Sequence, residues 1–272
     1  MIEKIIFEGD STVITDKKII VTGASSGIGK AILTLLAQEK SNTIIAAARN
    51  MSKAGDLGEN VICFNCDLST QAGVDALFDF AAEKIGYADL FFCNAGAPYY
   101  EKFDYEDWGR IERIFSLNTV AHIYTYSKYI NQLNGRPGRL IYTVSAMGEM
   151  AIPGYSLYAS TKFAMKGFQE AIRGEMPKNV KLTCVYPVST NTNFFNVAGE
   201  GRKMSKPFPV QEPQAVANAV VKGVEAGKKH IYPCKVFRPS KLLMTVVPPV
   251  KMAYLAVEKG RLKKYIKIKN GK

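Results

Sequence analysis

Residues 18–38 read KIIVTGASSGIGKAILTLLAQ, an apolar run of strand length followed by a glycine-rich turn and a segment with helical periodicity. Glycines in such a turn allow a tight chain reversal and the close approach of a ligand to the backbone. The start of the following helix offers unpaired N–H groups and a positive dipole end, which suit a pyrophosphate. Glycine also occurs in turns that only reverse the chain, but its place between a first strand and a first helix favours dinucleotide binding. The residues expected to contact the cofactor here are Gly23, Ser25, Ser26, Gly27, Ile28 and Gly29.

Apolar runs of strand length alternate with helical segments along most of the chain, which is typical of parallel strands joined by crossover helices. The expected strands are 18–22, 43–48, 61–65, 90–93, 139–144, 180–186 and 230–232. Helices are expected near 28–39, 70–85, 106–133, 156–175 and 213–226. Right-handed crossovers predict an α/β fold, a Rossmann-like doubly wound parallel sheet of about seven strands with helices on both faces. In such a sheet, ligands bind beyond the carboxyl ends of the strands.

Length and composition indicate one globular domain over residues 1–272, because 47% of the 272 residues are hydrophobic and no repeat or low-complexity run divides the chain. The formal charge of +12 is unevenly distributed. Residues 1–227 carry 23 basic and 23 acidic side chains, whereas residues 228–272 carry 13 basic side chains and one acid, Glu258. The charge excess therefore belongs to a tail, and a nucleic-acid partner is not expected.

The N-terminal residues Met1–Lys4 lack the build of a signal peptide, and the hydrophobic runs are too short to cross a bilayer, so a cytoplasmic protein is expected. The five cysteines include the pair in CFNC at residues 63–66. No second pair and only two histidines accompany it, so we expect free thiols and no metal site.

Three tyrosine–lysine pairs share the i, i+4 spacing that places two side chains on one face of a helix. These pairs are Tyr124/Lys128, Tyr158/Lys162 and Tyr265/Lys269. Only Tyr158 has a hydroxyl thirteen residues earlier, on Ser145. A cation close to a phenol favours the phenolate and brings its pKa from ~10 toward the range useful in acid–base catalysis. Tyr158 and Lys162 are therefore the candidate catalytic pair, and the other two pairs are expected to have no such role.

In their order and spacing, several motifs resemble the short-chain dehydrogenase/reductase (SDR) family over roughly residues 17–232. They are TG-x3-G-x-G at 22–29, NAG at 94–96, Asn118, Ser145 and Y-x3-K at 158–162. This resemblance implies an NAD(P)-dependent oxidoreductase that interconverts a carbonyl and an alcohol. By the same resemblance, Tyr158 would protonate the carbonyl oxygen as hydride arrives, and Ser145 would hydrogen-bond that oxygen. Lys162 would lower the pKa of Tyr158 and hold the nicotinamide ribose, while Asn118 would position a water of the proton relay. Fixed donors of this kind stabilise a developing alkoxide.

The cofactor form is predicted from the end of the second strand, where AAARN at residues 46–50 offers no carboxylate to the ribose hydroxyls. Arg49 suits a 2′-phosphate, so NADP is favoured over NAD, with a solvated surface arginine as the alternative. The resemblance implies that Asp67 lies near the adenine and that Leu68 also contacts the cofactor, although Asp67 also fits the N-cap of the next helix. Further contacts implied by the resemblance are Asn94, Ala95, Gly96, Tyr158, Lys162, Pro187, Thr190 and Thr192. Where the family has Pro-Gly, this chain has Pro187-Val188, which leaves open whether the backbone is displaced there.

Residues 189–212 are too long and too apolar for a simple connection, and we predict a lid over a bulky hydrophobic substrate. Packing of its aromatic residues into the core is the alternative. Residues 233–272 form a basic and apolar C-terminal extension, in which Pro248-Pro249 predicts a break in any helix. Two interpretations of this extension stay open. It is either a helical cover of the pocket or subunit interface, or a surface in peripheral contact with an anionic membrane.

The leading prediction is an NADP(H)-dependent SDR enzyme that acts on a bulky hydrophobic carbonyl or alcohol and assembles as a homo-oligomer, a dimer or tetramer. Two alternatives stay open. One is a sensor or scaffold protein that binds a dinucleotide without catalysis. The other is a membrane-peripheral enzyme that reduces a lipid ketone.

Overall fold

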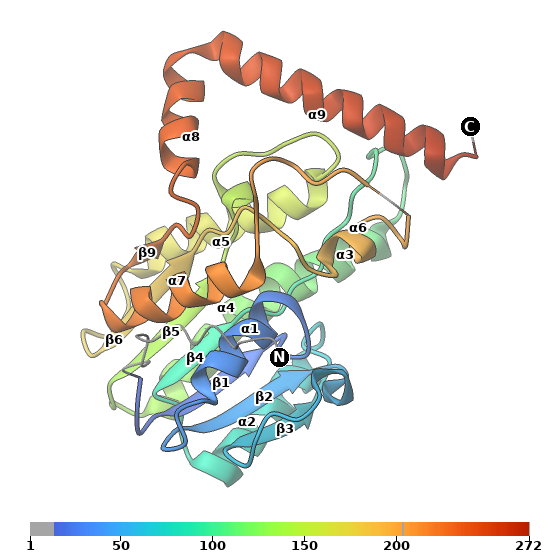
Figure 1. Ribbon diagram of the computed structural model, residues 1–272. Coiled ribbons are helices and arrows are strands. Elements are labelled where there is room, and N and C mark those ends of the chain that lie inside the picture. Colours follow the sequence, from blue (N-terminus) through green and yellow to red (C-terminus); the bar gives the residue numbers. More distant parts are fainter. Residues whose placement is uncertain (1–13, 203, 272) are drawn as a thin grey trace, which may run out of the picture.

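The computed structural model describes residues 14–202 and 204–271, so the residues Met1–Lys4, from which we expect no signal peptide, lie outside it. Its centre is a sheet of seven parallel strands in the order β3-β2-β1-β4-β5-β6-β9 (Figure 1). The strands are β1 (Lys18–Thr22), β2 (Thr43–Ala48), β3 (Val61–Asn65), β4 (Leu90–Cys93), β5 (Gly138–Thr143), β6 (Val180–Val185) and β9 (His230–Ile231). The predicted Rossmann-like fold is confirmed, with strand ends that differ from the prediction by one residue at most.

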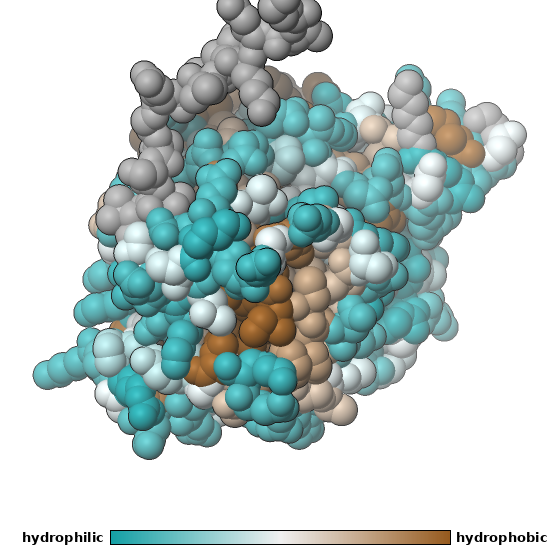
Figure 2. Space-filling model, turned by 60° about the horizontal axis from the view of Figure 1, so that its bottom comes forward, coloured by the Kyte–Doolittle hydropathy of each residue, from teal (hydrophilic) through white to brown (hydrophobic). Residues whose placement is uncertain are grey.

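Helices cover both faces of this sheet (Figure 1). On one face, α1 (Gly27–Leu36) and α7 (Pro213–Glu225) pack together over side chains of β1 and β2. The helices α2 (Gln71–Ile85), α4 (Ala121–Leu133) and α5 (Ser156–Ile172) cover the other face. The central strands are buried from both sides, which explains their continuous apolar sequence. Figure 2 shows one outer face, which is largely hydrophilic with a hydrophobic area near its middle.

The helix predicted over residues 106–133 is divided in the structure. Helix α3 (Trp108–Phe115) is joined to α4 by a π turn, η2 (Ser116–Val120), which contains Asn118. A π turn inserts one extra residue into a helix and is frequent at functional sites. Because no glycine or proline in Ser116–Val120 marks an irregularity, the sequence predicts a single regular helix and misses the π turn.

The segment predicted as a lid, residues 189–212, contains two short strands and one short helix. Strand β7 (Ser189–Thr190) pairs with β8 (Val210–Gln211), and α6 (Phe194–Ala198) lies between them in the chain. Phe195 is buried in an aromatic cluster, whereas Phe208 is 71% exposed. Some aromatic residues of this segment therefore pack in the core and others do not.

The C-terminal extension forms two helices, α8 (Phe237–Val246) and α9 (Pro248–Lys269). The predicted break is present: both prolines occupy the first positions of α9, where proline is tolerated, and the helix axes bend by 114°. Within the described part of the chain, no single helix is long and apolar enough to cross a membrane, although α8 and α9 taken together meet those two criteria. Figure 1 shows α9 spanning the end of the molecule above α5 and α6.

Candidate active site

A cavity of about 850 Å³ extends along the carboxyl ends of the sheet strands, where this fold binds its ligands. One part is lined by the glycine-rich turn and the other by the lid segment and α8. Of the predicted site residues, those that line the cavity are Gly23, Ser25, Ser26, Gly27, Ile28, Arg49, Asp67, Leu68, Asn94, Ala95, Gly96, Ser145, Tyr158, Lys162, Pro187, Thr190 and Thr192. Gly29 and Asn118 do not line the cavity, and both contact residues that do.

The glycine-rich turn has a shape that side chains would prevent. Gly23 and Gly27 adopt φ angles of 63° and 58°, which favour glycine. A Cβ atom on Gly29 would lie 2.3 Å from the Gly23 carbonyl oxygen, so Gly29 shapes the turn without facing the cavity. The N-cap of α1, Ser26, makes no side-chain capping bond, and the first turn of α1 contains no acid. The first N–H groups of this helix are therefore available to an anion, and the turn fits a dinucleotide pyrophosphate.

Two cations line the cavity where β2 ends. Arg49 follows the strand directly, and Lys53 lies on the short helix η1 (Met51–Ala54). Sequence reasoning named Arg49 but missed Lys53. The missed signal is a second basic residue four positions later, close enough to face the same ligand if the chain turns at Asn50.

Asp67 lies at the same end of the cavity. The backbone N–H and the hydroxyl of Ser69 donate to its carboxylate at 3.0 and 2.8 Å, and these bonds, together with the charge of Arg49, lower its pKa. The alternative role as a helix N-cap is wrong, because Thr70 caps α2 by accepting a hydrogen bond from Gly73. The position of Asp67 is compatible with the adenine contact implied by the resemblance.

The candidate catalytic pair lies one turn apart on α5, with both side chains lining the cavity. Tyr158 is buried, and Ser145 lies near enough to its hydroxyl to influence its pKa. The Lys162 ammonium lies 5.6 Å from the centre of the Tyr158 ring and donates to the Thr143 carbonyl at 3.1 Å. The fold thus brings together the phenol, the ammonium and the hydroxyl that the sequence spacing singled out.

The ionisation of this pair differs from what the resemblance implies. Burial raises the pKa of Tyr158 to about 12, and the hydrogen bond with Ser145 offsets only part of that effect. Burial also lowers the pKa of Lys162 to about 8. Both shifts have the same cause, since a water-excluded site disfavours the charged form of either group. The lowered pKa expected for Tyr158 is therefore not found, and its phenol is protonated at neutral pH.

Ser145 is held in a strained backbone conformation, with φ 103° and ψ 149°. Its hydroxyl oxygen accepts a hydrogen bond from the N–H of Met147 at 3.1 Å, at the start of the short helix η3 (Ala146–Gly148). Strain of this kind persists where the surrounding structure fixes a residue, and it is common in active sites. Here it holds Ser145 at the cavity wall, which Tyr158 also lines.

Asn118 is completely buried in the π turn and uses its amide within the protein. It accepts a hydrogen bond from the N–H of Ala97 at 2.9 Å and donates to the Ala97 carbonyl at 2.9 Å and to the Thr161 hydroxyl at 3.2 Å. These bonds connect the segment after β4 to α5. The side-chain contacts thus fit a positioning role, and the water contact that the resemblance implies stays a prediction.

Two further residues, missed by sequence reasoning, hold the same centre. His122 donates from Nε2 to the Ala95 carbonyl at 2.9 Å, because a carbonyl can only accept. Burial, and secondarily the charge of Lys162, lower the pKa of His122 to about 3, so its ring is neutral. Thr143 donates from its hydroxyl to Asn94 at 3.1 Å while its carbonyl binds Lys162. The cofactor segment and the catalytic lysine are therefore parts of one hydrogen-bond network.

The remainder of the cavity is mostly apolar. Its lining comes from the segment after β5, from α6 and the lid, and from α8 and α9. These residues include Met147, Met150, Ile152, Phe194, Phe195, Val197, Pro207, Phe208, Pro209, Phe237, Met244 and Tyr254. The side chains from α8 and α9 show that the extension covers the pocket, one of its two open interpretations.

The segment with Pro187-Val188, where the family has Pro-Gly, still lies beside the cavity. Val188 packs beside Phe237 and also lines the cavity. Thr192 lies next to the glycine-rich turn, with its methyl carbon 3.2 Å from the place of a Cβ on Gly27. The segment after β6 therefore still reaches the cofactor end of the cavity.

The other two tyrosine–lysine pairs make contacts of a different kind. Tyr124 and Lys128 both bind the Asp75 carboxylate, each at 2.8 Å. Tyr265 is buried in an aromatic cluster, and Lys269 pairs with Glu200 at 3.1 Å.

All five cysteines are free, and in residues 14–202 and 204–271 no three His, Cys, Asp or Glu side chains are grouped to hold a metal ion.

Comparison with known proteins agrees with this geometry. The family model of short chain dehydrogenases matches residues 17–203. The chain belongs to the short-chain dehydrogenase family. This short-chain dehydrogenase is an NAD(P)-dependent oxidoreductase, as its named relatives are dehydrogenases and reductases.

Among its relatives is the 3-ketodihydrosphingosine reductase of Bos taurus, 30% identical over an alignment of 227 residues that covers 77% of this chain and 68% of the relative. Another is estradiol 17-beta-dehydrogenase 11 of Pongo abelii, 26% identical over 262 residues, 92% of this chain and 84% of the relative. A solved short-chain dehydrogenase from Sphingobium yanoikuyae, in complex with NADPH, superposes with a TM-score of 0.71 at 22% identity, covering 80% of this chain and 88% of that one. At that identity the likeness shows the fold alone.

Proposed function

We propose that this short-chain dehydrogenase uses NADPH to reduce the ketone of a bulky, lipid-like substrate to a secondary alcohol. The observation that carries the proposal is the position of Tyr158. It shares the cavity wall with Ser145, Lys162 lies over its ring, and the ring packs edge-to-face on Phe194 of the lid segment at 5.4 Å. A proton donor thus stands between the polar and apolar parts of one cavity.

The residues of this chain support an acid-catalysed reduction. A bound dihydronicotinamide would supply the hydride that adds to the carbonyl carbon. Tyr158 would transfer its proton to the carbonyl oxygen, and Ser145 would donate a hydrogen bond to that same oxygen. Because the pKa of Tyr158 is about 12, the phenol holds the proton it must donate at neutral pH. Lys162, with a pKa of about 8, would stabilise the phenolate that remains.

The preference for NADPH rests on the two cations beside β2. Arg49 and Lys53 both line the cavity there, and residues 46–50 place no carboxylate against a ribose 2′-hydroxyl. A guanidinium pairs well with a phosphate, and a second cation strengthens that field. Both features favour the 2′-phosphate of NADPH.

The proposed substrate class rests on the apolar part of the cavity. Its lining includes methionine, phenylalanine, proline and tyrosine side chains from the lid, α8 and α9. A small polar ketone would leave much of this surface uncovered, whereas an acyl chain or a fused ring system would bury it. The names of the relatives point the same way, since one is a reductase of a sphingoid ketone and the other an estradiol dehydrogenase.

A panel of short-chain, long-chain and steroid ketones, assayed with NADPH and with NADH, tests the proposal. We expect turnover with NADPH, the highest kcat/KM for a long-chain or ring ketone, and a lower KM for NADPH than for NADH. Tight NADPH binding with no turnover over the whole panel would overturn the catalytic proposal and favour the sensor or scaffold alternative. The oligomeric state stays a prediction, and gel filtration with light scattering on the same preparation measures it.

A further inference from the structure

Apolar side chains are exposed around the bend between α8 and α9. They are Val236, Leu242, Leu243, Val246, Val247, Val250, Met252 and Val257. Val246 is 70% exposed and Met252 69%, so these side chains are not parts of a core. Soluble surfaces carry scattered apolar residues, but a large group of them on neighbouring turns marks an interaction site. We call the exposed side chains of residues 235–269 the C-terminal surface.

All exposed charges of the C-terminal surface are positive. The exposed cations are Lys235, Arg238, Lys251, Lys259, Lys263, Lys264, Lys267 and Lys269. The single acid in this segment, Glu258, is 2% exposed and pairs with Arg261 at 2.6 Å. The chain thus combines exposed apolar side chains at the bend with cations along the outer face of α9.

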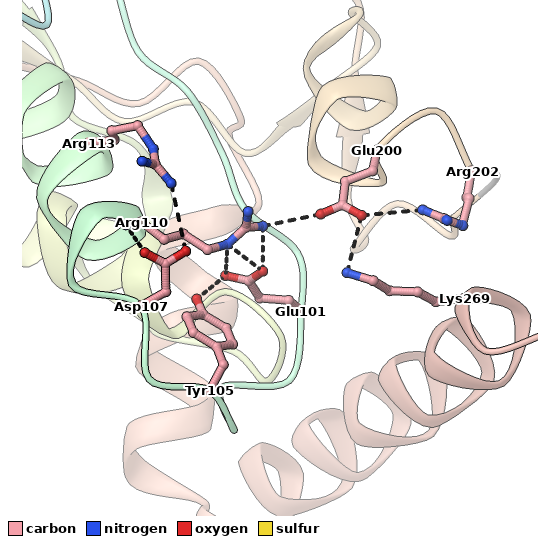
Figure 3. Close-up of polar contacts among 8 residues, drawn as sticks. All are labelled: Glu101, Tyr105, Asp107, Arg110, Arg113, Glu200, Arg202 and Lys269. Atoms are coloured by element: carbon pink, nitrogen blue, oxygen red, sulfur yellow. Dashed lines mark hydrogen bonds and ion pairs between the residues drawn. The ribbon is translucent and has the colours of Figure 1, made fainter.

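Ion pairs fix these helices to the body and leave their outer faces uncovered. Lys241 of α8 pairs with the buried Glu149 at 2.6 Å, and Tyr232 donates to the same carboxylate at 2.7 Å. At the other end of α9, Lys269 pairs with Glu200, which also binds Arg110 at 3.2 Å (Figure 3). The two helices therefore present the C-terminal surface in a defined orientation.

The inner side of the same two helices lines the cavity. Ser240, Lys241 and Met244 of α8 and Tyr254 of α9 belong to its wall. The exposed residues Leu242, Leu243 and Val246 lie on α8, together with the wall residues Ser240, Lys241 and Met244. A hydrophobic molecule that leaves a bilayer at this surface would thus have only the width of α8 to pass before it reaches the cavity.

We propose that the C-terminal surface docks on an anionic lipid bilayer, with the apolar bend in the headgroup region and the cations of α9 on the lipid phosphates. Exposed apolar and cationic residues together bind such membranes, and a cation near the surface contributes roughly 1 kcal/mol. A second copy of this chain is a poorer occupant, because a symmetric contact would bring two uniformly positive surfaces together. The docking rests on the surface itself, and delivery of a lipid ketone from the membrane rests on the proposed function.

Vesicle cosedimentation of the full chain tests the docking without reference to activity. The probes are phosphatidylcholine vesicles with and without phosphatidylserine, at low and high salt. We expect binding only to the anionic vesicles, weakened by salt. The variant K259Q/K263Q/K264Q/K267Q should bind roughly a hundredfold or more weakly, since each charge is worth about fivefold. The matched control K178Q/K181Q/K228Q/K229Q removes four exposed lysines elsewhere and should bind like the wild type.

A second variant, L242S/V246S, tests the apolar bend. It should weaken vesicle binding at least tenfold while leaving turnover of a water-soluble ketone unchanged, since neither side chain lines the cavity. No binding to anionic vesicles at low salt, or equal losses in the two lysine variants, would overturn the docking. A dimer that this variant converts to monomers would also overturn it, in favour of a second copy. Vesicle binding without NADPH turnover would contradict only the proposed function.

Discussion

Replacing Lys162 with methionine should stabilise the fold while it impairs the enzyme. Lys162 is 4% exposed, and burial lowers its pKa from 10.5 to about 8. Below pH 8 this lysine is charged in both the folded and the unfolded chain, so folding must bury the ammonium. At 1.36 kcal/mol for each pH unit, that burial costs on the order of 3 kcal/mol. Methionine has a similar length and no charge, and it loses the hydrogen bond to Thr143, which is worth about 1 kcal/mol. The free energy of unfolding at pH 7 should therefore rise by roughly 2 kcal/mol.

The sign of this effect depends on pH. A lysine whose folded pKa lies below its unfolded value destabilises the fold fully below the folded pKa. That cost fades as pH rises through the window from about 8 to 10.5. The advantage of Lys162→Met should accordingly shrink over the same window. Urea denaturation of the cofactor-free protein at several pH values measures it.

The control for this measurement is Lys128→Met, which changes the lysine of another tyrosine–lysine pair. Lys128 forms a partly exposed ion pair with Asp75 at 2.8 Å, and its pKa is raised chiefly by its hydrogen bond to that carboxylate. Its loss should be neutral or slightly destabilising, by less than about 1 kcal/mol. A destabilised Lys162→Met variant at pH 7, or a gain that does not change with pH, would refute the reasoning.

Three further predictions follow from the same site. Because the pKa of His122 is lowered to about 3, the free energy of unfolding should fall as pH drops from 6.5 toward 3, by about 2 to 3 kcal/mol between pH 7 and 4.5. Urea titrations of His122→Gln should find a smaller fall over the same range. In Gly29→Ala the new Cβ would lie 2.3 Å from the Gly23 carbonyl oxygen, so the variant should be less stable by about 1 to 3 kcal/mol and should bind NADPH more weakly in calorimetry. An unchanged affinity for NADPH would contradict the turn geometry. The double variant Arg49→Ala/Lys53→Ala should raise the KM for NADPH at least about tenfold, while its KM for NADH should stay within about twofold of the wild-type value. Equal increases in the two KM values would contradict a 2′-phosphate site.

The strand pattern and the order of the motifs were sufficient to predict the sheet and most of the cavity wall. Apolar runs such as KIIVT and LFFC are long enough to identify buried parallel strands, and the glycine-rich turn identifies the first of them. The spacing of Ser145 and Tyr158 singles out one of the three pairs, and in the structure Ser145, Tyr158 and Lys162 all line the cavity.

The features that the sequence did not predict depend on tertiary contacts. The π turn around Asn118 lies in a stretch, Ser116–Val120, that contains no glycine or proline to mark it. The raised pKa of Tyr158 follows from the burial of its phenol, which no local spacing reveals. Lys53 and His122 are ordinary residues in the sequence and gain their meaning only from what the fold places beside them.

The most direct test of the central claim is the effect of Tyr158→Phe on NADPH-dependent reduction of the best ketone in the panel. The substitution removes one hydroxyl and keeps the ring that packs on Phe194. The account predicts that kcat falls by about 10² to 10⁴-fold while the dissociation constant of NADPH changes by less than about threefold. A kcat within a few-fold of the wild-type value would contradict it, because Tyr158 would then not be the proton donor.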